Sequence, residues 1–451
     1  MWRAVFGGRI ARDTLWNLAG RAVPMAIGVL AVPVVVRYLS RADFGLLGLA
    51  WAVLGYMTML DLGIGRATTK YVAASLAAPG APRLGQVVLI SVSGLTGLGV
   101  IGGLALVALA PWLAHGVLGL PGASARDAIL VFRLLAVAVP FSLLSQALSA
   151  VLEGARRFDL VNRIRFPASS LVFLVPAAGA VAGVGVPGIV AVLVLVRVAV
   201  AGAMWIAVLH SLPARLSLRV HDTGLLRELA GFSGWVAVSS VLSPLMVYAE
   251  RFVLASLAGL GPLAYYTPPA EAATRVLVLP SSLANAVFPV FSAAEQTGGR
   301  AAARRLAVRA AATLAAVMIV PTLLIVAFAY PLLTLWLGAD FAVHGMTALQ
   351  VLAIGVFANS LGFIPHDFLQ ATGRPDLTAK LHLVEAPVYA VLVWLMVSRY
   401  GIVGAALAWT TRLIADAVAL SVLAHGRGSA PGSIPSAPFG ASALRDNRIG
   451  G

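Results

Sequence analysis

The chain has 451 residues, of which 60% are hydrophobic and only 11% charged, and its mean hydropathy is +0.95. Soluble domains carry about a quarter charged residues, so this composition excludes an ordinary soluble protein. The net charge is +15, but basic loops on one side of a membrane explain this excess without a nucleic-acid partner. The chain has no cysteine, which excludes disulfides and thiolate chemistry.

Apolar runs about as long as the hydrocarbon core of a bilayer predict an all-α polytopic membrane protein. Gly, Pro and charged residues divide these runs into twelve expected transmembrane helices, at 13–36, 43–64, 84–112, 128–152, 164–184, 187–211, 228–257, 262–292, 304–336, 346–370, 377–398 and 402–424. Residues 213–227 are polar and are expected to be a cytoplasmic linker between an N-terminal part, 1–212, and a C-terminal part, 228–424. Residues 425–451 are rich in Gly, Ser and Pro and are expected to be a disordered cytoplasmic tail.

The basic residues test this helix count, because an error of one helix would scramble their distribution between the two sides. With these spans, 22 of the 32 basic residues fall in loops on one side and 4 on the other. The sequence therefore predicts that both termini are cytoplasmic. The remaining basic residues lie inside expected helices and are Arg21, Arg133, Arg197, Arg251, Arg275 and Arg412.

An internal duplication relates the two parts of the chain. At an offset of about 217 positions, residues 131–160 match residues 348–377 and Arg157 falls on Arg374. Each copy holds six expected helices, an even number, so both copies enter the membrane from the same side and are related by an axis along its normal. We therefore expect two parallel six-helix lobes around a central cleft, which is typical of transporters. The equivalent outer loops 40–45 and 258–263 are expected to lie near one another.

Three short segments carry a resemblance to a known family. They are Arg37–Leu46 (RYLSRADFGL), Asp61–Ala73 (DLGIGRATTKYVA) and Ala371–Asp376 (ATGRPD). With the duplication, the chain resembles over residues 1 to about 424 the O-antigen and exopolysaccharide flippases, the Wzx-like branch of the multidrug, oligosaccharidyl-lipid and polysaccharide exporter superfamily. The lipid II flippase, a relative of this branch, typically has fourteen helices. The twelve helices expected in this chain argue against its being a lipid II flippase.

This resemblance implies alternating-access transport of an undecaprenyl-pyrophosphate-linked oligosaccharide across the bacterial inner membrane, for cell-surface polysaccharide biosynthesis. It implies membrane lipid as a partner, and polysaccharide polymerase or chain-length proteins as further candidate partners. No cofactor is expected, and H⁺ or Na⁺ remains open as the coupling ion.

A polar stripe on the expected helix 262–292 is the main candidate for the substrate passage. It follows helical spacing through Thr267, Glu271, Thr274, Val278, Ser281, Asn285 and Pro289, with Arg275 beside it. The first helix carries a shorter stripe with Asn17 and Arg21. Hydrogen bonding between helices in a dry bundle is the alternative explanation.

Arginine suits a pyrophosphate because its planar fork donates two hydrogen bonds and stays charged. The candidate substrate-binding residues are Arg21, Arg251, Arg275, Asn17 and Asn285, and the candidate ion-coupling residues are Glu271, Glu250 and Asp61. Glu271 stands four residues before Arg275, an order that favours an ion pair, whereas Asp61 has the alternative of capping backbone or pairing with Arg66.

The other embedded polar residues are expected to have structural roles. Arg412 has Asp416 one turn on, and Arg133 and Arg197 lie on helices away from the expected cleft. His366-Asp367 and the pair His382 and Glu385 suggest metal ligands, but further ligands at usable spacing are not evident, so no metal site is expected.

Two other functions compete with a flippase. An ion-coupled multidrug or cation exporter of the same superfamily would share the architecture, but it would use acidic residues, and residues 14–36 offer Arg21 and no acid. A membrane enzyme would need a sizeable extramembrane domain, whereas the longest expected outer loop is 113–127. We therefore expect a transporter and not an enzyme.

Overall fold

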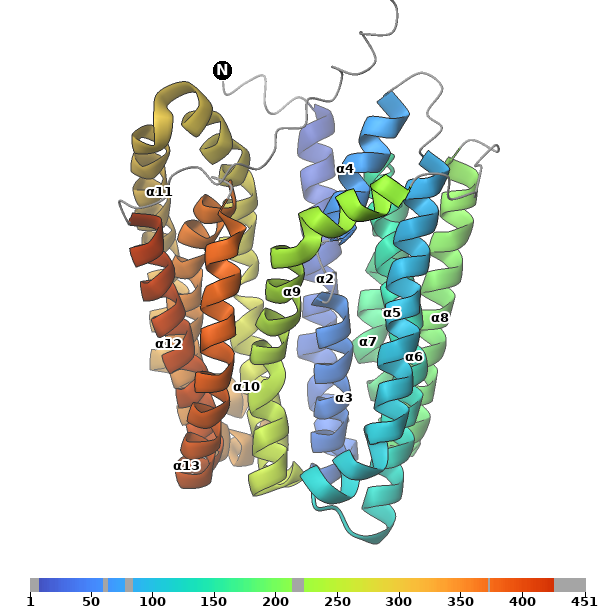
Figure 1. Cartoon of the computed structure of the whole chain (residues 1–451). Coiled ribbons are helices and arrows are strands. Elements are labelled where there is room, and N and C mark those ends of the chain that lie inside the picture. The colour runs from blue at the N-terminus through green and yellow to red at the C-terminus, as the bar shows by residue number, and fades with distance from the viewer. Residues whose placement is uncertain (1–7, 60–63, 78–83, 213–222, 372–373, 426–451) are drawn as a thin grey trace, which may run out of the picture.

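The computed structural model describes residues 8–59, 64–77, 84–212, 223–371 and 374–425 (Figure 1). The regular elements of these ranges are helices, as the sequence predicts. In the N-terminal half they are α2 (Gly8–Tyr38), α3 (Arg41–Met59), α4 (Ile64–Ala77), α5 (Leu84–Trp112), the π-helical turn η1 (Leu113–Val117), α6 (Gly122–Gly154), α7 (Phe158–Val181) and α8 (Val186–Ser211). In the C-terminal half they are α9 (Thr223–Ala258), α10 (Leu260–Arg275), α11 (Val278–Leu337), α12 (Ala339–Ala371) and α13 (Pro375–His425).

Eight helical segments are long and apolar enough to cross a membrane, among the residues that the structure describes. This number is lower than the expected twelve for identifiable reasons. The segment at 376–424 has 49 residues and contains two helices that meet at Gly401, which has φ 54° and ψ −125°. Helix α10 has only 16 residues and includes two prolines, Glu271 and Arg275. A many-helix membrane fold is therefore confirmed, whereas the count of twelve stays a prediction.

Several expected helix boundaries are wrong, among them the gap expected at 293–303, which α11 (Val278–Leu337) spans as helix. The helix expected at 43–64 ends at Met59, and a separate helix, α4, which the sequence analysis did not predict, follows at 64–77. The helix expected at 262–292 breaks at Val276 and Leu277, whose N–H groups bond to the carbonyls of Ala273 and Thr274 at 3.2 and 3.1 Å. Pro280 has no N–H to donate to the Val276 carbonyl, so the α-helical ladder cannot run through this turn.

The two halves of the chain occupy two sides of the molecule (Figure 1). Helices α5 to α8 gather on one side and α11 to α13 on the other, with α2, α3, α9 and α10 between them. Helix α11 turns over at the top of the view, where α2 also begins and α13 ends. The expected linker lies largely, and the expected tail almost wholly, outside the described residues.

Glycines on α3 allow the halves to approach closely. A Cβ added at Gly45 would collide with the Leu260 carbonyl at the start of α10, and one at Gly48 would lie 2.7 Å from the Thr267 hydroxyl. Backbones come this near only where a side chain is missing. The expectation that the outer loops 40–45 and 258–263 lie near one another is therefore confirmed.

Candidate functional site

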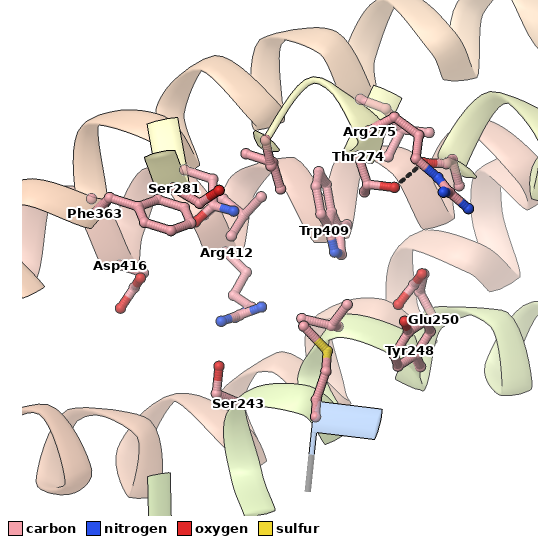
Figure 2. Close-up of a pocket in the computed structure, with 18 of the residues that line it drawn as sticks. Ser243, Tyr248, Glu250, Thr274, Arg275, Ser281, Phe363, Trp409, Arg412 and Asp416 are labelled. Atoms are coloured by element: carbon pink, nitrogen blue, oxygen red, sulfur yellow. Dashed lines mark hydrogen bonds between the residues drawn. The ribbon is translucent and has the colours of Figure 1, made fainter. Parts of the chain in front are cut away.

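A cavity of about 580 Å³ lies within the C-terminal half of the chain (Figure 2). Helices α9 to α13 form its walls, and Met59 at the end of α3 is the lining residue from the N-terminal half. Its polar lining consists of Ser243, Tyr248, Glu250, Arg251, Tyr266, Glu271, Thr274, Arg275, Ser281, Asn359, His366, His382, Trp409, Arg412 and Asp416. Such a concentration of charge inside apolar helices makes this cavity the candidate functional site, because each embedded charge has a substantial insertion cost.

Two acids and two arginines form a chain of ion pairs along one wall. The Arg251 guanidinium lies 2.9 Å from a Glu271 oxygen and 3.8 Å from a Glu250 oxygen. The other Glu271 oxygen accepts a bond from Arg275 at 3.3 Å. Glu271 is thus shared by both arginines, which are brought from α9 and α10 onto one carboxylate. Four of the expected site residues therefore lie together.

Arg251 lies in the cavity wall but is almost completely buried. Its side chain is only 3% exposed, its guanidinium lies 5.1 Å from the ring centre of Tyr248, and its neighbour Glu250 is 2% exposed. Glu250 also accepts bonds from the hydroxyls of Tyr266 and Tyr389, each at 3.4 Å. Because both partners of Arg251 are internal carboxylates, its main role in this conformation is to neutralise them.

Arg275 is the accessible arginine of this wall. Its side chain is 36% exposed, and its ion-pair partner Glu271 is also paired with Arg251. Its guanidinium also lies 5.1 Å from the ring centre of Phe173 on α7, so it reaches a side chain of the N-terminal half. A half-paired guanidinium in this position is able to bind an anion without first leaving a buried ion pair.

A second charged cluster lies at the other end of the cavity, and the sequence analysis predicted it only in part. Arg412 was expected to pair with Asp416, but the ion pair that the structure gives it is with Glu385 on the same kinked helix, at 3.9 Å. The His382 ring lies 4.0 Å from Asp416, and its other nitrogen 3.2 Å from the Ser239 hydroxyl. Figure 2 shows the Arg412 side chain reaching into the cavity between Asp416 and Ser243.

Asp416 adds a third possible metal ligand to His382 and Glu385, which the sequence analysis did not find. One ligand atom each from His382, Glu385 and Asp416 lie within 4.8 Å of one another, as they would in a metal site. Asp416 was missed because it is far from His382 in sequence and its spacing to Arg412 indicated a local pair. The Arg412 guanidinium occupies the same cluster, and a fixed cation beside these ligands disfavours a metal ion.

The remaining expected site residues divide into two groups. Asp61 lies outside the described residues, as do the side chains of Asn17, Arg21 and Asn285. From the polar stripe, Thr274, Val278 and Ser281 line the cavity, whereas Thr267 is buried and bonds to the Leu263 carbonyl at 2.9 Å.

Comparison with known families identifies the relationship of this chain. The family model described as "Polysaccharide biosynthesis protein" matches residues 10–295, more than half of the sequence. The chain belongs to this family. The resemblance to polysaccharide flippases, which was read from three short segments and the duplication, is therefore confirmed at the level of the family.

Individual relatives of this family member cover nearly the whole chain. A "Putative O-antigen transporter" from Shigella flexneri is 29% identical over 420 residues, which span 92% of this chain and 97% of the relative. An inward-facing multidrug resistance MATE family transporter of the MOP superfamily has a TM-score of 0.78 at 16% identity, over 90% of this chain and 97% of that one. An outward-facing MATE transporter of the superfamily has a TM-score of 0.64 at 19% identity, over 90% and 93% of the two chains.

The lipid II flippase MurJ in an inward closed conformation is also similar. Its TM-score is 0.69 at 13% identity, over 90% of this chain and 86% of that one. At such identities the likeness shows the fold alone. The family member described here therefore has the MATE- and MurJ-like fold of the superfamily, and it is a multi-pass membrane protein.

Proposed function

We propose that this protein is a flippase that moves an undecaprenyl-pyrophosphate-linked oligosaccharide across the bacterial inner membrane, for cell-surface polysaccharide biosynthesis. Its twelve transmembrane helices form two parallel six-helix lobes that alternate access to a passage between them, and both termini are cytoplasmic. Three things support this proposal: the family, the relative described as an O-antigen transporter, and the basic residues concentrated on one side of the expected membrane.

The observation that carries the proposal is the accessible Arg275 fork inside an apolar helical bundle. An anionic head group cannot cross about 30 Å of hydrocarbon unaided, so its carrier needs a polar passage with a cation. Arg275 offers this cation. Arg251 is assigned the supporting role of a buried counter-charge to Glu271 and Glu250. Arg21 and Asn17 on α2 and Asn285 on α11 remain proposed contacts on the same path.

Glu271 then acts as an internal substitute for the substrate. In the empty protein its carboxylate pairs with Arg275, and a bound pyrophosphate takes its place because a doubly anionic group competes well for a planar fork. Glu271 stays paired with Arg251 after this exchange. Glu271 and Glu250, with Asp61 nearer the cytoplasm, are the proposed groups that couple the cycle to H⁺ or Na⁺.

A second function has a specific observation in its favour. The cavity wall holds Glu250, Glu271 and Asp416, which equal its three arginines in number, and buried acids are suited to binding cations. The fold is also that of a MATE multidrug transporter. An ion-coupled multidrug or cation exporter is therefore the alternative proposal.

One experiment separates the two functions. The purified protein is reconstituted into liposomes with an undecaprenyl-pyrophosphate-linked oligosaccharide on the inner leaflet, and a lectin outside reports the sugar that appears there. We expect wild type to expose the sugar, and both Arg275→Ala and Arg275→Lys to lose most of this activity, because lysine lacks the bidentate fork. Glu271→Gln should retain substrate binding and slow release.

Outward movement of a cationic dye in the same liposomes, without exposure of the sugar, would establish the alternative. Normal sugar exposure by Arg275→Ala at wild-type protein content would remove Arg275 from the site. In cells, chemical identification of the lipid-linked intermediate that accumulates in a deletion strain would name the sugar unit.

A further inference from the structure

An arginine at the start of α3, in the N-terminal half, is held by side chains of the C-terminal half. Helix α3 begins at the lower end of the molecule in Figure 1. Arg41 is the first residue of α3, and its guanidinium lies 2.6 Å from the carboxylate of Asp340 near the start of α12. Its Nε also donates to the hydroxyl of Tyr265 on α10 at 3.3 Å. The two halves are thus joined here by a cation on one side and an anion on the other.

The side chains that contact Arg41 also contact one another. The Tyr265 hydroxyl donates to Asp340 at 2.9 Å, the His344 ring stacks on Tyr265 with 4.5 Å between ring centres, and Phe341 lies 4.9 Å from Tyr265. The Arg41 guanidinium lies 4.7 Å from the ring centre of Phe341. These four side chains, Tyr265, Asp340, Phe341 and His344, form what we call the outer cup, and all belong to α10 and α12.

Arg41 itself is set in place by the start of its own helix. The Ser40 hydroxyl accepts a bond from the Asp43 N–H at 3.1 Å and donates to the Asp43 carboxylate at 2.7 Å, which is an N-terminal cap. The acid of this cap is occupied by Ser40, so Arg41 is directed to the opposite half of the molecule.

We propose that Arg41 and the outer cup form a reversible latch, which closes this end of the molecule in the observed conformation and releases when the two halves separate here. The pair is suited to this role because both side chains are partly exposed, at 42% and 49%, and exposed ion pairs separate at little cost. The cup keeps its shape after release because its own contacts lie within one half. Closure therefore needs only the return of one side chain.

Two other contacts between the halves lie near this end. The Trp336 indole N–H of α11 donates to the Val29 carbonyl of α2 at 2.6 Å. That carbonyl is free because Pro33, four residues later, has no N–H. Gly45 of α3 meets the Leu260 carbonyl of α10. These contacts let the two halves pack closely at this end of the molecule. The latch adds an ion pair between the halves, which would be lost when this end opens.

The test measures the opening of this end directly and requires no transport substrate, so its failure is distinct from failure of the proposed function. The chain has no native cysteine, so spin labels are placed on Tyr38→Cys and Val343→Cys, two exposed positions on opposite halves, in lipid nanodiscs. Pulsed electron resonance then gives the populations of short and long distances.

We expect Arg41→Ala and Asp340→Ala each to raise the ratio of open to closed molecules by about threefold to tenfold, the range expected for a partly exposed ion pair with an aromatic contact. Arg37→Ala is the matched control: it removes an exposed arginine four residues earlier, in the last turn of α2, which has no ion pair among the described residues, and it should leave the ratio unchanged. The exchanged pair Arg41→Asp with Asp340→Arg should return the ratio toward wild type.

A distance distribution for Arg41→Ala that matches the Arg37→Ala control would overturn the latch. An exchanged pair as open as the single variants would equally exclude the ion pair as its basis. Size-exclusion profiles identify any variant that has not folded, and Arg41→Lys provides a milder change, which should give an intermediate ratio because it keeps the charge and loses the planar fork.

Discussion

Glu271 shows how two arginines of the same cavity wall come to differ. Arg251 and Arg275 each lie on an expected helix and each has an acid nearby in the sequence, Glu250 directly before Arg251 and Glu271 four residues before Arg275, so the sequence alone does not show which of them is buried. The structure gives Arg251 the buried Glu250 and the half-buried Glu271, whereas Arg275 has only the other oxygen of the shared Glu271 carboxylate and is partly exposed. The first arginine is therefore a structural counter-charge and the second a ligand candidate.

We expect Arg251→Ala to destabilise the fold, because it leaves Glu250 and Glu271 without their common counter-charge. Breaking a buried ion pair by removing one partner costs about 3 to 5 kcal/mol. The variant should show reduced membrane abundance and a lower unfolding temperature in detergent, measured by tryptophan fluorescence. Arg275→Ala is the matched control and should unfold close to wild type. Equal stability of both variants would contradict the assignment of Arg251 as a buried counter-charge.

At the scale of helices, glycine and proline positions decide where the backbone hydrogen bonds of a helix are interrupted. The break expected at 398–402 is present because Gly401 takes a positive φ, a conformation that side chains disfavour. The break at 276–277 was not expected, because Pro280 stands in an apolar run that reads as one helix. Proline is normally tolerated in the first turn of a helix, and Pro280 lies in the first turn of α11. The sequence does not show that a new helix begins there, and the hydrogen bonds of Val276 and Leu277 do.

Gly401→Ala tests the first of these breaks. The substitution forces a residue with a Cβ into a conformation used almost only by glycine, which costs about 1 to 3 kcal/mol. We expect a lower unfolding temperature of the purified protein. Gly202→Ala on α8 is the control, since a Cβ there meets nothing within 4 Å and it should leave stability unchanged or slightly raised. A Gly401→Ala protein as stable as Gly202→Ala would be incompatible with the observed kink.

For the molecule as a whole, the arrangement of the basic residues predicts which end faces the cytoplasm. Helix α2 begins and α13 ends at the upper end of Figure 1, as an even number of crossings requires. The lower end would then be the periplasmic side.

Cysteine labelling tests this orientation, because the native chain contributes no background. Phe158→Cys, at the exposed start of α7 beside Arg156 and Arg157, should be protected from an impermeant reagent added to the periplasm. Ser124→Cys, at the exposed start of α6, should react. The reverse pattern would contradict the orientation and with it the cytoplasmic placement of both termini.

A crosslink across the closed end tests whether the halves must separate there during transport. Ala42→Cys with Leu260→Cys should form a disulfide, since Gly45, one turn from Ala42, already meets Leu260. We expect the oxidised protein to bind substrate but not to expose it outside, and reduction to restore transport. Each single cysteine variant should transport normally. Full transport by the crosslinked protein would exclude a mechanism in which this end opens.

The sequence by itself determined the class of the molecule, since hydropathy and charge distribution depend on composition along the chain and need no contact between distant residues. The same holds for the duplication and the family likeness of residues 37–46. The sequence analysis also selected Glu250, Arg251, Glu271 and Arg275, because charged residues inside apolar runs are conspicuous without a structure.

Only the tertiary structure decided what these residues do to one another. Arg41 and Asp340 are 299 positions apart, and His382, Glu385 and Asp416 come from both sides of the Gly401 kink, so their proximity has no local signal. The difference between Arg251 and Arg275 is likewise a difference in burial and in partners supplied by other helices. Pairing and exposure depend on how helices pack, and packing joins residues whose spacing along the chain carries no periodic pattern.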